Sequence, residues 1–356
     1  MAKIHITKRK ELTRNQIALL RFISVIAAIV VGGIFILCLR KNPFSVYARL
    51  ISGAFRSKIA FRSTIKIMIP LLISALGVTL AFRMKFWNIG AEGQIIFGGI
   101  FASYFALFHS NLPHALLMIL MFIAGIIGGG LWGLIPATFK AKYNTNETLF
   151  TLMLNYIALY TVVFLRDGPW ADPESGGFPK IARFTDNAQM GSILGVQSGW
   201  VIAFVLVVLV FIYLKFTKQG YEIDVVGESS STASYAGMDV KKITLRTMFL
   251  SGGICGLAGM VQVAGADMTL TTSVAGGVGF TAIIVSWLAN LNSFGILLVS
   301  FLFSVLEKGS GVIESDFGIS TYCADVLQGI ILFTVLAGEF FIRYKFMISK
   351  EGGRVK

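Results

Sequence analysis

Residues 115–139 read ALLMILMFIAGIIGGGLWGLIPATF, an uninterrupted run without a charged side chain. A helix needs roughly 20 such residues to cross about 30 Å of hydrocarbon. The same pattern returns in four more uncharged blocks, namely Phe22–Leu39, Thr148–Leu165, Ala188–Leu214 and Thr247–Ala266. The sequence therefore predicts an all-α, polytopic membrane protein.

We expect about ten transmembrane helices, with short or broken helices near the centre. Residues 268–306 must hold two of them and fold back at residues 290–293, and polar turns at that depth are typical of broken or re-entrant helices. Together the spans form one transmembrane domain, residues 22–341, between the basic tails 1–21 and 342–356. The expected spans are Phe22–Leu39, Ile67–Phe82, Gly93–Phe108, Ala115–Ile135, Thr148–Leu165, Trp200–Leu214, Thr247–Val263, Phe280–Leu291, Phe294–Leu306 and Thr321–Phe341.

The composition fits this class, with 55% hydrophobic and 14% charged residues, where soluble domains carry about 25% charged residues. We interpret the net charge of +13 as loop anchors that set orientation, which disfavours nucleic-acid binding. The cysteines Cys38, Cys255 and Cys323 lack CxxC spacing and are interpreted as core-filling residues. We expect no metal site and no cofactor. Only three histidines occur, which disfavours a membrane-embedded enzyme.

The distribution of basic residues predicts the orientation. If the N-terminus is cytoplasmic and the first apolar block is retained as a helix, 20 Lys and Arg lie inside and 11 outside. The positive-inside rule then places both termini in the cytoplasm, the loop 166–199 outside and the loop 215–246 inside. The basic segment 40–66 falls on the outer side, where we expect an amphipathic helix lying in the interface.

No polar segment is long enough for a soluble domain, because the longest have only about 30 residues. The chain also lacks a GxxxxGK[ST] phosphate loop. If ATP drives this protein, another chain must hydrolyse it, so the chain is not expected to be an enzyme.

Several strings in order resemble motifs of one group of ABC importer permeases. They are Phe86–Gln94 (FWNIGAEGQ), Asn146–Thr148 followed by Met153–Ala158 (MLNYIA), Tyr235–Lys241 (YAGMDVK) followed by Ser251–Gly259 (SGGICGLAG), and, in part, Gly279–Ile283 (GFTAI). The group is the simple-sugar and nucleoside permeases, related to ribose and branched-chain amino-acid permeases. The resemblance runs from about Lys41 to Gly338, and the long N-terminal region resembles the larger of the group's two permease types.

The resemblance implies a set of partners and a place. They are a cytoplasmic ATPase, a second and different permease that makes a heterodimer, an extracytoplasmic substrate-binding protein, a small polar solute and the lipid of a bacterial plasma (inner) membrane. It ranks nucleosides first as solute, with simple sugars and riboflavin-like compounds behind. The sequence departs from the group at Ser229–Ser231 and Ser286–Asn290, and the second departure leaves the solute open.

Polar residues within the apolar spans are the candidate substrate path. Asn88, Glu92 and Gln94 offer hydrogen bonds to a polar solute, or Glu92 is a structural cap that fastens two helices together. Asn155 and Tyr156 contact the solute or bond across helices. The remaining candidates are Trp287 and Asn290, which would stack on and bond to a nucleobase, unless Trp287 faces lipid or the core.

The segment 228–242 is the candidate coupling site. Residues 227–237 are expected to form a short helix closed by Gly237, and the resemblance implies that this helix docks in a groove of the ATPase with Tyr235 as its anchor. A plain connector is the alternative. The candidate coupling residues are Glu228, Ser234, Tyr235, Ala236 and Gly237.

Two further interpretations complete the prediction. An ion-coupled secondary transporter is the competing function, with Glu92, Glu147 and Asp267 as relay candidates, although Asp267 is most simply a solvated loop residue. The glycines within residues 125–133 and 252–259 have small-xxx-small spacing, which favours close helix packing over a phosphate site.

Overall fold

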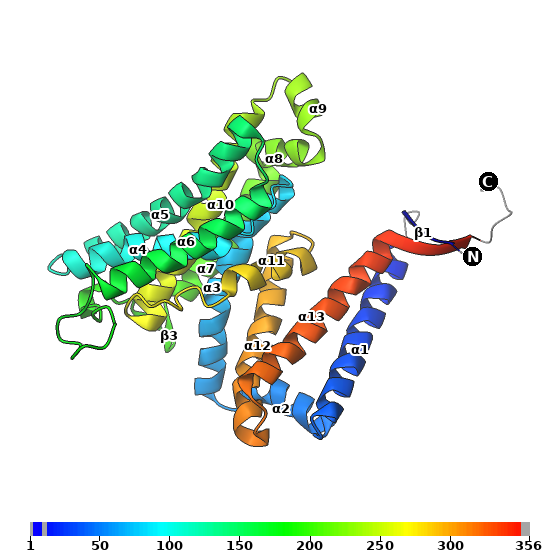
Figure 1. Cartoon of the computed structure of the whole chain (residues 1–356), viewed down its shortest axis with the longest axis horizontal. Coiled ribbons are helices and arrows are strands. Elements are labelled where there is room, and N and C mark those ends of the chain that lie inside the picture. Colours follow the sequence, from blue (N-terminus) through cyan, green and yellow to red (C-terminus); the bar gives the residue numbers. More distant parts are fainter. Residues whose placement is uncertain (1–2, 9–12, 350–356) are drawn as a thin grey trace. The chain divides into compact units, whose positions relative to one another are not determined.

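The computed structural model describes residues 3–8 and 13–349, and these fold almost entirely into helices (Figure 1). The helices of eleven or more residues are α1 (Arg14–Cys38), α2 (Pro43–Phe55), α3 (Lys58–Arg83), α4 (Ala91–Phe108), α5 (His114–Tyr143), α6 (Glu147–Asp167), α7 (Gly199–Phe216), α8 (Lys218–Glu228), α10 (Val240–Gln262), α11 (Val278–Leu288), α12 (Ser293–Phe317) and α13 (Thr321–Arg343). The short elements are β1 (Lys3–Lys8), η1 (Asp186–Ala188), β2 (Ser192–Ile193), β3 (Val196–Gln197), α9 (Ser230–Tyr235), η2 (Val263–Asp267) and β4 (Tyr344–Ser349). The predicted fold class is confirmed.

Eight of the helices in the described ranges are long and apolar enough to cross a membrane, or nine if α1 and α2 form one broken span. The chain bends by 112° between those two helices. The expected span Phe280–Leu291 is instead the 11-residue helix α11, too short to cross. The expectation of about ten full spans is therefore slightly high, while the short helix near the centre is confirmed.

By its internal packing the described chain falls into two compact units, residues up to Ala60 with those from Val305, and residues Phe61–Ser304. In the second unit α10 packs against α4 and α5 through glycines. A Cβ on Gly98 would fall on the backbone of Gly256, and one on Gly129 would fall on that of Gly252. The predicted packing role of the glycines is confirmed, because only a missing side chain lets these backbones touch.

The unit that holds both chain ends is built on α1, α2, α13 and the end of α12. Its core lies between α1, α2 and the α12–α13 turn, where Tyr47 donates its hydroxyl to the carbonyl of Ile29 at 2.8 Å and Arg49 pairs with Asp316 at 3.3 Å. The core residues are Ile36, Val46, Leu50, Ile313, Ile319 and Leu327. The helix expected within residues 40–66 is present as α2.

The tails contain a feature that the sequence did not predict. Strand β1 pairs antiparallel with β4, with Lys3 opposite Ser349 and Lys8 opposite Tyr344. Each tail was expected to be a plain basic extension. Pairing between strands that lie more than 300 positions apart leaves no local trace in the sequence.

The second unit is interrupted where the sequence suggested broken helices. Helix α10 runs into the π-helix η2, and α11 begins only after an irregular stretch that ends at Gly277, whose φ is +82°. Between α11 and α12, Asn290 and Leu291 have φ of +51° and +55°. The predicted fold-back at residues 290–293 is thus confirmed as a tight turn.

Candidate translocation path and coupling segment

The segment before α4 holds two amides that bond to each other. Asn88 and Gln94 are 0% and 1% exposed. The Nδ2 of Asn88 donates to Gln94 Oε1 at 3.2 Å, and Gln94 Nε2 donates to Asn88 Oδ1 at 3.3 Å. Asn88 Oδ1 also accepts from the N–H of Gly90 at 3.0 Å. In this conformation the two side chains stabilise the turn into α4, and their polar atoms bond to each other and to the backbone of that turn.

Glu92, in the first turn of α4, bonds to the start of α11. Its Oε1 accepts from the N–H of Gly277 at 2.7 Å, and its Oε2 accepts from the N–H of Gly279 at 2.8 Å. The N–H groups of a first turn have no partner within their own helix, and the helix dipole favours an anion there. This geometry supports the structural-cap alternative for Glu92, because the carboxylate joins α4 to the first turn of α11.

Asn155 on α6 holds the same turn from the other side. Its Oδ1 accepts from the N–H of Gly93 at 2.9 Å, and its Nδ2 donates to the carbonyl of Ile89 at 2.9 Å. Nearby, Thr151 Oγ1 accepts from the N–H of Ile89 at 3.1 Å. These bonds support the cross-helix alternative for Asn155. Tyr156 is exposed on the outer face of α6, so the structure does not bring it to this network.

Trp287 lies in an aromatic cluster that joins α11 to the turn before α4. Its ring stacks on Trp87 at 5.6 Å between centroids and 14° between planes, and Phe82 packs against both rings at 5.7 and 5.9 Å. Trp87 is 47% exposed. We did not single out Trp87 from the sequence, although it lies in the string that carries Asn88. Asn290 is exposed in the α11–α12 turn, apart from the buried amides.

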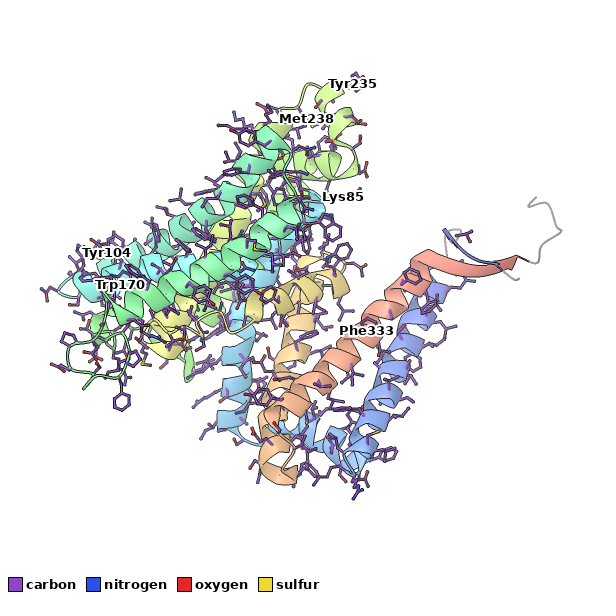
Figure 2. All side chains as sticks on the ribbon, in the orientation of Figure 1. Lys85, Tyr104, Trp170, Tyr235, Met238 and Phe333 are labelled. Carbon is purple, nitrogen blue, oxygen red and sulfur yellow. The ribbon has the colours of Figure 1, made fainter. Side chains whose placement is uncertain are left out.

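The predicted coupling segment is a short helix at one end of the second unit. Ser229 caps α9, where its Oγ accepts from the N–H of Thr232 at 3.2 Å. The helix ends at Tyr235. Gly237 closes it with φ of +78°, and the N–H of Met238 bonds to the carbonyl of Ala233 at 3.0 Å. Tyr235 is 94% exposed and points away from the bundle (Figure 2). The expected short helix closed by Gly237 is present, but it covers only Ser230–Tyr235, because Gly227 and Glu228 belong to α8.

The coupling segment is attached to the membrane helices through α8. Glu222 on α8 pairs with Arg246 on α10 at 2.9 Å. Asp224 lies 3.6 Å from Arg83 at the end of α3, and its burial raises the pKa of its carboxyl group, although Arg83 lowers it. Behind α9 lies a cavity of about 960 Å³, which Glu228, Ser234 and the first residues of α10 help to line. Helix α8 thus connects α9 to α3 and α10.

The three relay candidates of the competing function each have a different partner. Glu92 caps α11, Glu147 pairs with Lys140 at 2.9 Å, and Asp267 accepts from Gln262 Nε2 at 2.9 Å. Asp267 is partly buried at the end of η2, so its description as a solvated loop residue is wrong. The span was expected to end at Val263, but η2 continues it to Asp267, which is therefore part of the helix and not of a loop.

The two long loops of the second unit lie at opposite ends of its bundle, with Trp170 at one end and Tyr235 at the other (Figure 2). That the loops 166–199 and 215–246 face opposite sides of the membrane, and which of them is cytoplasmic, stay predictions. The three cysteines are free, and Cys255 is buried as expected, whereas Cys38 is exposed on α1 and does not fill a core.

Comparison with known proteins places the chain among transporter subunits. The family "Branched-chain amino acid transport system / permease component" matches residues 59–336. The glucose ABC transporter permease protein TsgB13 of Haloferax volcanii is 29% identical, over 92% of this chain and 89% of its own length. The guanosine ABC transporter permease proteins NupP and NupQ of Bacillus subtilis are 28% and 26% identical, over 94% and 67% of this chain and 97% and 77% of their own lengths.

Proposed function

Because the chain belongs to the branched-chain amino acid transport system permease component family, and is thus a membrane subunit of an ABC importer, we propose that it moves a nucleoside. The subunit does not hydrolyse ATP itself. An ATPase and a substrate-binding protein work with it. The proposal concerns where the ATPase docks on this chain and which solute the substrate-binding protein delivers.

The observation that carries the coupling proposal is the exposed tip of α9. A tyrosine that is 94% exposed on a capped, well-formed helix is unusual unless a partner covers it, because an aromatic ring gains free energy on burial. A Cβ added at Gly237 would meet no atom within 4 Å, so the space beside the turn after Tyr235 is open to close approach. The cytoplasmic ATPase is the partner we assign, with Glu228, Ser234, Ala236 and Gly237 around the anchor.

The nucleoside proposal rests on two observations. NupP and NupQ are named as guanosine permeases, and the stacked pair of Trp87 and Trp287 exposes an aromatic surface of the kind on which a base stacks. TsgB13 is named as a glucose permease, so a simple sugar is the second candidate. Aromatic rings also pack on sugars, so the tryptophan pair does not distinguish a nucleoside from a simple sugar. The transport assay below distinguishes them.

We further propose that this permease pairs with a second, different permease chain. The support is that NupP and NupQ come from the same strain and both resemble this chain. In the proposed assembly both termini are cytoplasmic, and the chain lies in the plasma membrane of a bacterium. The surplus of Lys and Arg on that side supports this orientation.

The test is transport by the full chain, reconstituted in proteoliposomes with its ATPase, second permease and binding protein. Tyr235→Ala is expected to abolish ATP-driven uptake and solute-stimulated ATP hydrolysis while leaving membrane insertion intact. Phe178→Ala is the matched control, because Phe178 is an aromatic residue 77% exposed in the loop 166–199.

Two results would count against the proposal. Uptake driven by a proton gradient without ATP would favour the secondary transporter, and normal stimulation of ATP hydrolysis in Tyr235→Ala would remove the coupling role of this helix. Competition of labelled guanosine uptake by unlabelled guanosine, but not by glucose, is expected for a nucleoside importer. Uptake of labelled glucose that is competed by unlabelled glucose, but not by guanosine, would assign a sugar.

A further inference from the structure

A cavity of about 400 Å³ lies where three membrane helices end. Arg83 is the last residue of α3, Lys215 is in the last turn of α7, and Ser293 is the first residue of α12, and all three line the cavity. Helix α8 closes it with Tyr221 and Asp224. Because membrane helices end at the boundary between hydrocarbon and headgroups, the cavity lies at the depth of lipid headgroups.

The charges of this cavity favour an anion. Arg83 and Lys215 face a single lining carboxylate, that of Asp224. The nearest atoms of Arg83 and Asp224 are 3.6 Å apart, longer than a charge-assisted hydrogen bond of about 2.7–2.9 Å. The guanidinium, which has five N–H donors, therefore keeps donors for a ligand.

Lys215 is held by aromatic rings. Its Nζ lies 5.3 Å from the ring centroid of Phe211 and 5.5 Å from that of Phe216. Such contacts fix the position of an ammonium without neutralising its charge. Across the cavity, Asn292 uses its Oδ1 to accept from the N–H groups of Phe294 and Gly295 at 3.0 and 3.1 Å. Its Nδ2 is a further donor of the kind that binds phosphate oxygens.

An apolar surface continues from the cavity along the membrane helices. Phe211 on α7 packs edge-on against Phe294 on α12 with centroids 5.0 Å apart. One turn beyond Phe294, Leu298 is exposed on the same face of α12, and Ile212 is exposed on α7. A ligand with an anionic head and hydrocarbon chains meets both surfaces, whereas a free phosphate compound would use only the first.

We infer that this cavity, which we call the α3–α7–α12 pocket, binds the phosphate headgroup of an anionic phospholipid whose acyl chains lie against α7 and α12. Basic pockets between membrane helices are suited to such headgroups. Since Tyr221 and Asp224 belong to α8, the bound lipid contacts the helix that leads into the coupling segment. None of the candidate residues of the solute path lines this pocket, and the inference does not depend on the solute.

The test uses the purified full chain in detergent and native mass spectrometry, with phosphatidylglycerol, phosphatidylcholine and glycerophosphoglycerol, which is the headgroup without chains. Phosphatidylglycerol is expected to bind more tightly than the other two. Lys215→Gln and Arg83→Gln should each weaken its binding by about fivefold, the factor for one basic residue near an anionic surface. Lys218→Gln is the matched control, because Lys218 is 88% exposed and does not line the pocket.

Asn292→Asp is a further test variant, chosen because it should still fold. It keeps an Oδ1 acceptor for the cap of α12 but places a negative charge in the pocket, so it should lower phosphatidylglycerol binding without lowering the apparent Tm of the lipid-free protein. Equal binding of phosphatidylglycerol and phosphatidylcholine, or equal effects of Lys215→Gln and Lys218→Gln, would overturn the inference. Binding of glycerophosphoglycerol as tight as that of the lipid would show a site for soluble phosphates and overturn it as well.

Discussion

Replacing Glu92 by Gln tests the joint between α4 and α11. The carboxylate accepts two N–H bonds, at 2.7 and 2.8 Å, and hydrogen bonds to a charged group each contribute about 1.5–3 kcal/mol. Gln keeps one acceptor and turns an NH₂ group toward the other N–H, so one bond is lost. It also loses the attraction between the charge and the helix dipole, roughly 0.3–1 kcal/mol. Glu92→Gln should therefore cost about 2–4 kcal/mol of stability, and Glu92→Ala more.

The assay is thermal unfolding of the purified chain in detergent, combined with hydrogen exchange of the amides of Gly277 and Gly279. Both variants should lower the apparent Tm and speed exchange at these two amides. The apparent Tm should be lowest and exchange fastest in Glu92→Ala, with Glu92→Gln between that variant and the wild type. Glu174→Gln is the control, because Glu174 is exposed in the loop 166–199. If Glu92→Gln unfolds at the wild-type temperature and leaves both amides protected, the carboxylate does not cap α11 in the working protein.

Two further predictions concern packing and pH. Gly129→Ala should prevent α10 from packing on α5 and abolish the yield of folded protein, because the new Cβ meets the backbone of Gly252. Gly191→Ala, whose new Cβ would meet no atom within 4 Å, should fold normally in the same size-exclusion assay. The N–H of Glu174 and the ammonium of Lys180 hold the pKa of Asp172 below its usual value. A lowered pKa stabilises the folded loop above the unfolded pKa, so protection of the loop 166–199 from protease should persist at neutral pH and be lost only below about pH 4. The protease should cleave the loop of Asp172→Asn faster than the wild-type loop at neutral pH. A wild-type loop that becomes sensitive to protease near pH 6 would show that Asp172 does not hold it closed.

The sequence predicted those features whose cause is local. Uncharged blocks mark the spans, Gly237 marks the end of α9, and Asn290 marks the turn between α11 and α12. It placed the start of α3 too late, at Ile67 instead of Lys58. Basic residues near the end of a membrane helix lower its hydropathy, yet their long side chains reach the interface without ending the helix.

The candidate site was harder to predict, because its partners are distant in sequence. Glu92 was recognised as a carboxylate that needs a partner, but Gly277 and Gly279 lie about 185 positions away, and no local pattern connects them. The same holds for Trp87 and Trp287. Composition located polar residues at membrane depth, whereas only the fold decides whether their polar atoms bond to each other or remain free for a solute.

The contacts of the second unit separate parts that move together from parts that can bend. Helix α10 touches the backbones of α4 and α5 through glycines, and Arg246 ties it to α8, so these helices pack as one body, and under the coupling proposal we expect them to shift together when α9 is displaced. Ser286 on α11 donates to the carbonyl of Ala75 on α3 at 2.8 Å. Packed helices shift as units and bend at their ends, so under the coupling proposal we expect the change at the irregular stretch 268–277 and at the turn at Asn290. Glu92 bridges across the first of these, and we therefore expect its two bonds to be strained if α10 moves relative to α11.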